Sequence, residues 1–224
     1  MKLYYCPYFN GSQELWEHPL HQEIVYIPPQ RVLEYTKKLH EGHTYWDCPA
    51  WRSYWNNSFV IFNQLDMEFE WDKEICKITK KSFKDPKTDY IKIQEITKDG
   101  MIFELTQQLL VWLPNKEKNV WAEVLPFPRM FHKTGLEYLS SEFPVSRWHK
   151  PMVPIYKAHA SKIKLKRGDP LYTIRFKGGK NNQYNLQPWK DLDPPEWLKT
   201  KFIQHNNMSR WVTGGVWNLF RRDT

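Results

Sequence analysis

The sequence has few cysteines and glycines and no long apolar run. Its three cysteines, Cys6, Cys48 and Cys76, occur among 224 residues at no repeating spacing, which excludes a disulfide-rich secreted scaffold. No apolar segment reaches the ~18 residues that would span a membrane, and no apolar signal-peptide core lies near the N-terminus. These absences predict a protein with reduced thiols, made in a cytoplasm and without a membrane span.

Motifs of several enzyme classes are absent as well. The chain has no G-x-S-x-G nucleophile elbow, no phosphate-binding glycine loop and no dinucleotide fingerprint. It also has no internal repeat and no low-complexity run. The sequence therefore favours a protein without a cofactor, and a binding role over an enzymatic one.

Aromatic residues are abundant, with Trp, Tyr and Phe at 12 each. A chain of this length can bury ~70% of the surface of its unfolded form, so it needs no metal or disulfide to build a core. Each large aromatic side chain buries ~150–250 Å², so these residues could carry most of the packing. We expect one mainly β domain over residues 1–192 and a helical tail over 193–224, which docks on the domain or on a partner.

Apolar and polar residues alternate with a period of two along much of the chain, which indicates half-buried strands. The turn residues Pro, Asp and Gly separate these segments at intervals of roughly ten residues. The strands expected from this pattern, together with the continuous apolar run 58–63, are 22–27, 66–72, 74–79, 89–96, 101–105, 119–125, 161–166 and 171–176, and a turn at 167–170 joins the last two. Without long helices between them, they predict an antiparallel sandwich or jelly-roll-like single domain.

Short helices are expected at three places. Residues 30–40 place Val32, Leu33 and Leu39 near one side of a helix, and residues 49–56 begin with a proline, which is favoured in a first turn. A third helix should begin after Pro194 and Pro195, with Trp197, Leu198 and Phe202 facing inward. Residues 126–155, rich in proline and aromatics, have no sustained period and are interpreted as a long irregular excursion.

The stretch YWDCPAWRSYWNN, residues 45–57, has the highest aromatic density in the chain. Helical spacing puts three of its rings on one face, where they would pack across the open end of the sheet or, as the alternative, stack on a sugar or a peptide. The thiol of Cys48 lies near the N-terminus of the expected helix, which would lower its pKa. Alternatively, Cys48 is an inert buried side chain. The aromatic cluster comprises Trp46, Cys48, Trp51, Tyr54 and Trp55.

Positive charge is concentrated in one segment. Nine Lys or Arg and one acid lie between Lys157 and Lys190, so this segment carries as much net charge as the whole chain, +8. Such a patch could bind single-stranded nucleic acid or an acidic protein. Alternatively, its lysines could form the solvent-exposed face of an edge strand. The candidate binding residues are Lys162, Lys164, Lys166, Arg167, Tyr172 and Arg175.

Two histidine groups are candidate metal ligands. His40 and His43 lie close to Cys48, and imidazole and thiolate both bind zinc. His21 and Glu23 have the spacing of part of a non-haem iron triad, with a distant third ligand such as His132, His149 or His159. The group of His21, Glu23 and a distal histidine would make the chain a metal-dependent enzyme of a β-barrel class.

Two segments resemble a family of uncharacterised proteins from T4-like tailed phages of marine cyanobacteria. CPAWRSYWNNSFVI, residues 48–61, is similar to that family's cysteine-proline-aromatic block, and IKLKRGDPLYTIRF, residues 163–176, is similar to its lysine-glycine-proline hairpin. The resemblance implies a phage origin and a place in the cytoplasm of an infected bacterium or in the virion. It brings no catalytic residue with it.

We therefore expect a phage-encoded, non-enzymatic protein that binds another macromolecule, either a virion component or a host protein. The expected contact surfaces are the basic strand 162–167 and the apolar tail, and a second copy of the chain is an alternative partner. The two other hypotheses are the metal-dependent enzyme and a protein that binds single-stranded nucleic acid.

Overall fold

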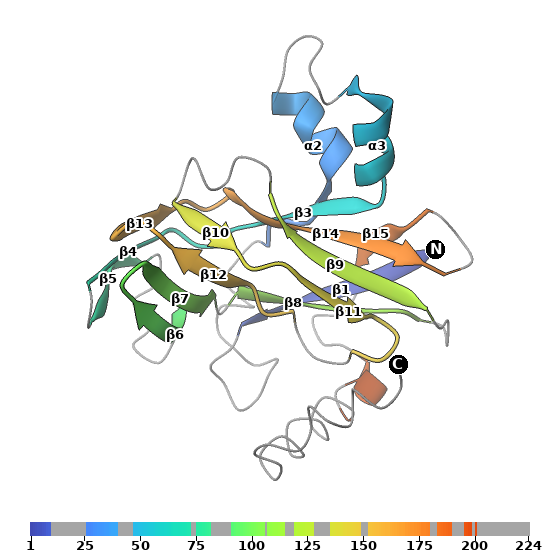
Figure 1. Cartoon of the computed structure of the whole chain (residues 1–224). Coiled ribbons are helices and arrows are strands. Elements are labelled where there is room, and N and C mark those ends of the chain that lie inside the picture. The colour runs from blue at the N-terminus through green and yellow to red at the C-terminus, as the bar shows by residue number, and fades with distance from the viewer. Residues whose placement is uncertain are drawn as a thin grey trace.

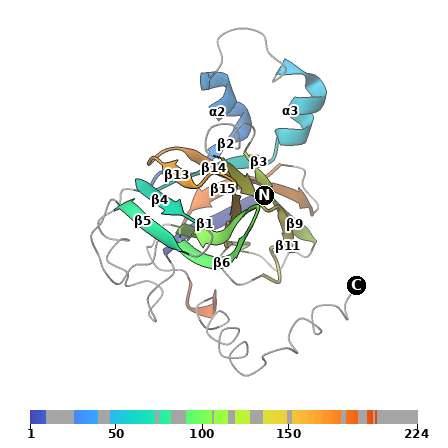
Figure 2. The ribbon, with the colours of Figure 1, turned by 60° about the vertical axis from the view of Figure 1, so that its left-hand side comes forward.

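The structure is a computed structural model in which the chain is mainly β, with a sandwich-like arrangement of antiparallel sheets and few short helices, as the sequence predicts (Figure 1). It describes residues 1–9, 26–39, 47–72, 75–81, 91–105, 107–114, 119–127, 135–148, 152–179, 183–189, 195–198 and 200. The two helices of this part are α2 (Val32–Leu39) and α3 (Pro49–Trp55). They stand together above β3 (Ser58–Phe62), on one side of the strands (Figures 1 and 2).

The strands form four sheets, each named here after one of its central strands. In the β14 sheet the order is β11 (Ser141–Pro144), β9 (Val120–Pro126), β14 (Pro170–Gly178), β3 and β2 (Gln30–Arg31). In the β7 sheet it is β10 (Leu136–Tyr138), β12 (Ile155–Ala158), β7 (Gly100–Leu105) and β6 (Ile91–Thr97). In the β4 sheet it is β13 (Lys162–Leu165), β4 (Met67–Trp71) and β5 (Cys76–Lys81). In the β1 sheet it is β15 (Asn185–Pro188), β1 (Lys2–Phe9) and β8 (Gln107–Trp112), where β1 and β15 form the one parallel pair among the described strands.

The period-two pattern located eight of these strands correctly, namely β3, β4, β5, β6, β7, β9, β13 and β14. It missed β1, β8, β12 and β15, as well as β2, where a helix was expected. It was also wrong about residues 126–155, because β10 and β11 lie inside that segment. Strands of three or four residues are too short to show a period, and their neighbours define them: the Leu139 N–H, for example, donates to the Ile155 carbonyl at 2.9 Å. Of the expected strand 22–27, the described residues Tyr26 and Ile27 are not in a strand.

The expected C-terminal helix is described for one turn only. Residues 196–198 are helical, and Leu198 is fully buried in a small cluster with Cys6, Leu110 and Trp112. Trp197, predicted to face inward, is instead 45% exposed. Residues 201–224, which include Phe202 and the rest of the expected tail, lie outside the described residues.

One long antiparallel pair connects the β14 sheet to the β4 sheet. The chain passes from β3 into β4, and β13 passes into β14 beside it, so that pairing extends from Ser58↔Arg175 to Glu70↔Lys162. Residues 162–175 contain one residue more than their partner segment, residues 58–70. A bulge between Pro170 and Tyr172 accommodates the extra residue. The pair bends between its two halves, at a corner formed by residues 63–66 and 166–169.

Two buried amides hold the corner together. The Asn63 side chain is completely buried, and its Nδ2 donates to the carbonyls of Leu65 at 2.5 Å and Lys166 at 2.9 Å. Gln64 Oε1 accepts from the Ile27 N–H at 2.7 Å, while its Nε2 donates to the Ile27 carbonyl at 3.2 Å. The two backbones also pair at the corner, since the Asn63 N–H donates to the Asp169 carbonyl at 2.8 Å and the Gly168 N–H donates to the Asn63 carbonyl at 2.8 Å. The two amide side chains add bonds to backbone groups beyond this ladder.

Buried tyrosines pack together where the β7 sheet meets the β14 sheet. The Tyr138 ring lies 5.2 Å from that of Tyr156 and stacks at 5.4 Å on that of Tyr172. Burial raises the pKa of all three well above the ordinary value, and it raises the pKa of Tyr5 to about 12. Among the described residues the hydroxyls of Tyr156 and Tyr172 have no hydrogen-bond partner.

We expect Tyr156→Phe to leave the free energy of unfolding at pH 7 unchanged or to raise it by up to ~1 kcal/mol, because it removes a buried hydroxyl that has no partner. Above pH ~10 the unfolded state releases phenol protons while the buried tyrosines keep theirs, so stability falls by ~1.4 kcal/mol per pH unit for each such tyrosine. The variant should lose stability less steeply, as urea denaturation between pH 7 and 11 would measure. As a control, Tyr138→Phe removes a hydroxyl that bonds Ser141 and should be destabilising at pH 7.

Asn63→Ala should lower the free energy of unfolding by ~2 kcal/mol, because the buried Leu65 carbonyl loses the Asn63 donor and the Lys166 carbonyl keeps only the bond from the Asp169 N–H. The control is Asn56→Ala, whose side chain is exposed and whose effect should stay within ~0.5 kcal/mol. Equal effects of the two substitutions in urea denaturation at pH 7 would contradict the role assigned to the corner.

Candidate binding surface

The basic strand β13 has the predicted orientation but not the predicted free charge. Ile163 and Leu165 are buried, and the alternating lysines face solvent. Lys162 Nζ lies 2.6 Å from Glu70 Oε1, and Lys164 Nζ lies 2.6 Å from Glu68 Oε1. The hydrogen bond and the charge of Glu70 raise the pKa of Lys162. Because β4 brings its acidic face alongside, the strip of positive charge expected from the sequence is largely neutralised.

Lys166 and Arg167 lie at the corner, in the turn predicted there. The Asp169 N–H donates to the Lys166 carbonyl at 3.0 Å, and Asp169 Oδ2 accepts from the Lys166 N–H at 2.8 Å. Gly168 supplies the positive φ, +89°, that such a turn needs at its third residue. Both basic side chains are exposed.

Tyr172 is not a surface residue, contrary to the prediction. It is 1% exposed, because β14 lies between β9 and β3 in the middle of its sheet. Its ring packs in the tyrosine core and cannot contact a partner.

Arg175 joins the basic segment to the aromatic stretch. Its guanidinium lies 3.8 Å from the centre of the Tyr54 ring, and its Nε donates to Glu123 Oε2 at 2.8 Å. Lys177 Nζ lies 2.8 Å from Glu142 Oε1 and 3.9 Å from Glu123 Oε2. A connected row of charges therefore crosses β11, β9 and β14 and ends under a tyrosine of α3.

The aromatic cluster divides between core and surface. Trp55 is buried, and Trp51 packs partly buried beside it with ring centres 5.4 Å apart. The core interpretation is right for these two rings and wrong for Tyr54, which is 46% exposed. Trp46 lies outside the described residues.

Cys48 stands just before α3 and is exposed, so the prediction of a buried thiol is wrong. The N–H groups of Trp51 and then Ala50 point at the sulfur and lower the pKa of Cys48, as a position before a helix predicts. Burial raises the pKa of the half-buried Cys76.

The metal-site hypotheses are not tested by this structure. His21, Glu23, His40, His43, His132 and His149 all lie outside the described residues. His159 is described, and its Nε2 lies 2.8 Å from Glu137 Oε2. Within the described part of the chain, no three or more His, Cys, Asp or Glu side chains group as they would to hold a metal ion.

Sequence reasoning missed Trp121, the second exposed ring of this region. In β9 the residues Val120, Ala122 and Val124 are buried, so Trp121 shares the opposite face with Glu123 and is 40% exposed. The sequence did contain a signal for this exposed ring, because Trp121 falls on the polar face of a strand whose apolar residues alternate. Register places it opposite Lys177 on β14, beside the Glu123–Arg175 pair.

We call this region the Tyr54–Trp121 surface. Its two rings and its charged row come from α3 and from three neighbouring strands. Its members are Tyr54, Trp121, Glu123, Glu142, Arg175 and Lys177.

Comparison with known proteins finds no family model that matches the chain and no curated protein similar in sequence. Among the described residues, no helix is both long enough and apolar enough to cross a membrane.

Iodoacetamide should alkylate Cys48 faster than Cys76 at pH 7, because the first thiol is exposed with a lowered pKa. The pH midpoint of the Cys48 rate should lie below the ~8.5 of an unperturbed thiol. Mass spectrometry of the digested protein would measure both rates. Faster labelling of Cys76 in the native protein would contradict this assignment.

Proposed function

We propose that the chain is a phage-encoded, non-enzymatic protein that binds another protein, a virion component or a host protein, through the Tyr54–Trp121 surface. The observation that carries the binding part is the exposure of a tryptophan and a tyrosine beside an arginine on one face. Trp, Tyr and Arg are the residues that most often dominate the energy of protein interfaces.

The surface is also preorganised. Glu123 and Tyr54 hold the Arg175 side chain from two sides, and Glu142 holds Lys177. Side chains that are already fixed lose less conformational entropy when a partner binds. The rings project from a helix and a central sheet, which keeps their positions defined.

The charges of the surface favour a protein over a nucleic acid. Glu123 and Glu142 are part of it, and carboxylates repel phosphate groups. The lysines that suggested nucleic-acid binding, Lys162 and Lys164, already pair with acids of β4. The phosphate-driven affinity expected of a basic groove therefore has less support than the sequence suggested.

Other parts of the proposal rest on the sequence. The phage origin rests on the resemblance of residues 48–61 and 163–176 to a phage family. The non-enzymatic part rests on the missing catalytic motifs, and one stoichiometric transition metal in the purified protein, measured by elemental analysis, would contradict it.

The test uses the full chain as bait in a lysate of a marine cyanobacterium infected by a T4-like phage. We expect it to retain one protein in stoichiometric amount, and Trp121→Ala and Tyr54→Ala each to weaken binding of that purified protein. Truncation of a hot-spot residue costs at least ~2 kcal/mol, which is a ~30-fold rise in Kd, and calorimetry would measure it.

Trp197→Ala is the matched control, because it makes the same change at a similarly exposed tryptophan outside the surface. It should leave the Kd within about twofold, a difference of less than ~0.5 kcal/mol. Retention of no protein, or equal binding by Trp121→Ala and the wild type, would refute the proposal.

A further inference from the structure

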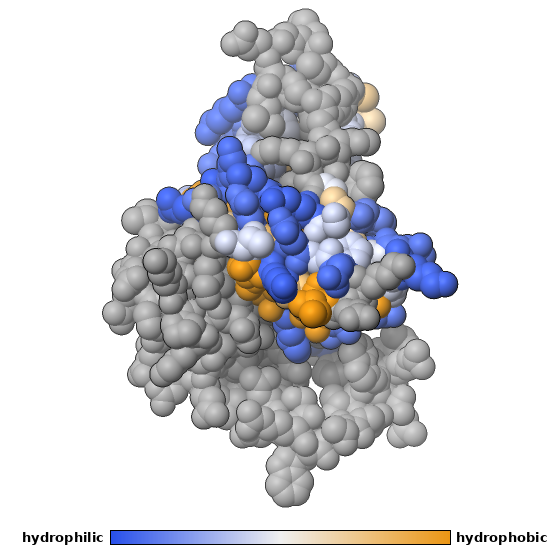
Figure 3. All heavy atoms as spheres, turned by 90° about the vertical axis from the view of Figure 1, so that its left-hand side faces the viewer, coloured by the Kyte–Doolittle hydropathy of each residue, from blue (hydrophilic) through white to orange (hydrophobic). Residues whose placement is uncertain are grey.

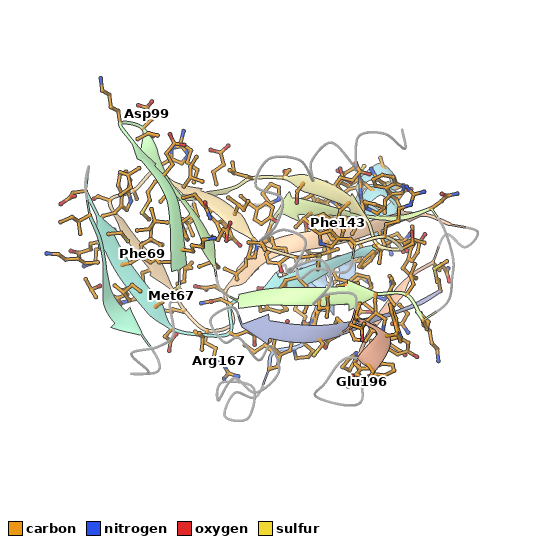
Figure 4. The ribbon with its side chains drawn as sticks, turned by 90° about the horizontal axis from the view of Figure 1, so that it is seen from below. Met67, Phe69, Asp99, Phe143, Arg167 and Glu196 are labelled. Carbon is orange, nitrogen blue, oxygen red and sulfur yellow. The ribbon has the colours of Figure 1, made fainter. Side chains whose placement is uncertain are left out.

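Two facing sheets of the sandwich each end in a strand that has only one neighbour among the described strands. β5 is the last strand of the β4 sheet and β6 is the last strand of the β7 sheet. The sheets face each other, since the Phe69 ring of β4 lies 5.1 Å from the Phe103 ring of β7. Figure 4 shows Met67 and Phe69 in the space between these strand pairs.

Each of the two outer strands has an exposed isoleucine on its inner face. Ile78 of β5 pairs with Phe69, and Ile93 of β6 pairs with Phe103, so both isoleucines lie on the faces that build the core. Phe69 and Phe103 are completely buried, whereas Ile78 is 37% and Ile93 is 41% exposed. Apolar side chains gather on this side of the molecule (Figure 3). We call the place between Ile78 and Ile93 the β5–β6 opening.

Both edges are shaped against regular strand pairing. The register shifts at Thr79 in β5 and at Gln94 in β6, directly after the exposed isoleucines. Bulges of this kind interrupt the ladder and discourage the edge-to-edge addition of another strand. A segment that binds here can pair only over a few residues, so its apolar side chains must contribute most of the affinity.

Charge selects the kind of segment. In sequence β5 carries Lys77, Lys80 and Lys81 and no acid, and β6 carries Lys92 and Glu95, so the two strands together have four lysines against one glutamate and a net charge of +3. Lys77 is exposed opposite Glu70, whose carboxylate bonds Lys162 across the sheet. The same lysines oppose a second copy, because two β5 edges brought together would repel each other. The rim of the opening therefore favours an acidic occupant.

We propose that the β5–β6 opening binds an extended segment of a partner protein, with apolar side chains seated between Ile78 and Ile93 and acidic residues beside Lys77. This second site goes beyond the Tyr54–Trp121 surface and stands on different residues. The occupant covers core-facing side chains that the two sheets leave exposed.

A displayed library of random dodecapeptides, selected on the immobilised full chain, tests the proposal. The enriched peptides should alternate apolar residues with Asp or Glu. Their synthetic versions should bind Ile78→Ser/Ile93→Ser at least tenfold more weakly, as fluorescence anisotropy would measure, and Lys77→Glu should weaken them as well. Both isoleucines are partly exposed, and near-ultraviolet circular dichroism would verify that the double variant folds.

Ile75→Ser is the matched control, because Ile75 is 52% exposed in the turn before β5, and its effect should stay below twofold. Trp121→Ala should also bind these peptides normally, which separates this site from the proposed function. The proposal fails if no peptide is enriched, if enriched peptides are basic, or if they bind the double serine variant as tightly as the wild type. It also fails if sedimentation shows a dimer that the double serine variant dissociates, since the occupant would then be a second copy.

Discussion

The buried amides of Asn63 and Gln64 are the contacts on which the arrangement of the sheets depends. A β-strand pair that changes sheets must turn, and a turning backbone leaves N–H and C=O groups that the neighbouring strand cannot reach. Asn63 donates to the carbonyls of Leu65 and Lys166, and Gln64 bonds both the N–H and the carbonyl of Ile27. Because these groups are satisfied inside the protein, one strand pair can belong to two sheets at once.

That bend places both of the regions for which we propose binding. On one side of the corner β14 runs through the centre of a five-stranded sheet and presents Arg175 beside β9, where Trp121 lies. On the other side the same chain segments continue as β13 and β4, whose outer neighbour β5 forms one wall of the β5–β6 opening. The two regions therefore depend on one continuous ladder, although they share no residue.

The pairing of charges changes the functional interpretation of the chain. Nine basic residues close in sequence suggested a patch for nucleic acid, but strand pairing sets β4 acids against Lys162 and Lys164 and a β9 acid against Arg175. Cross-strand ion pairs between exposed groups contribute little to stability, yet they decide which charges a partner meets. What remains prominent on the surface is aromatic and aliphatic: Tyr54 of α3 and Trp121 of the β14 sheet on one face, and Ile78 and Ile93 on the edges of two other sheets.

The alternation of apolar and polar residues determined the strands that have one solvent-exposed face, such as β4 and β13. The proline at position 49 determined where α3 begins. Those features depend on neighbours along the chain, so the sequence alone was enough. It could not locate β10 and β11, whose three or four residues carry no period, nor could it show that Tyr172 is buried or that Tyr54 lies over Arg175. Only the tertiary structure decided these points, because burial and charge pairing depend on which strands lie side by side, and residues more than a hundred positions apart, such as Asn63 and Lys166, fix that order.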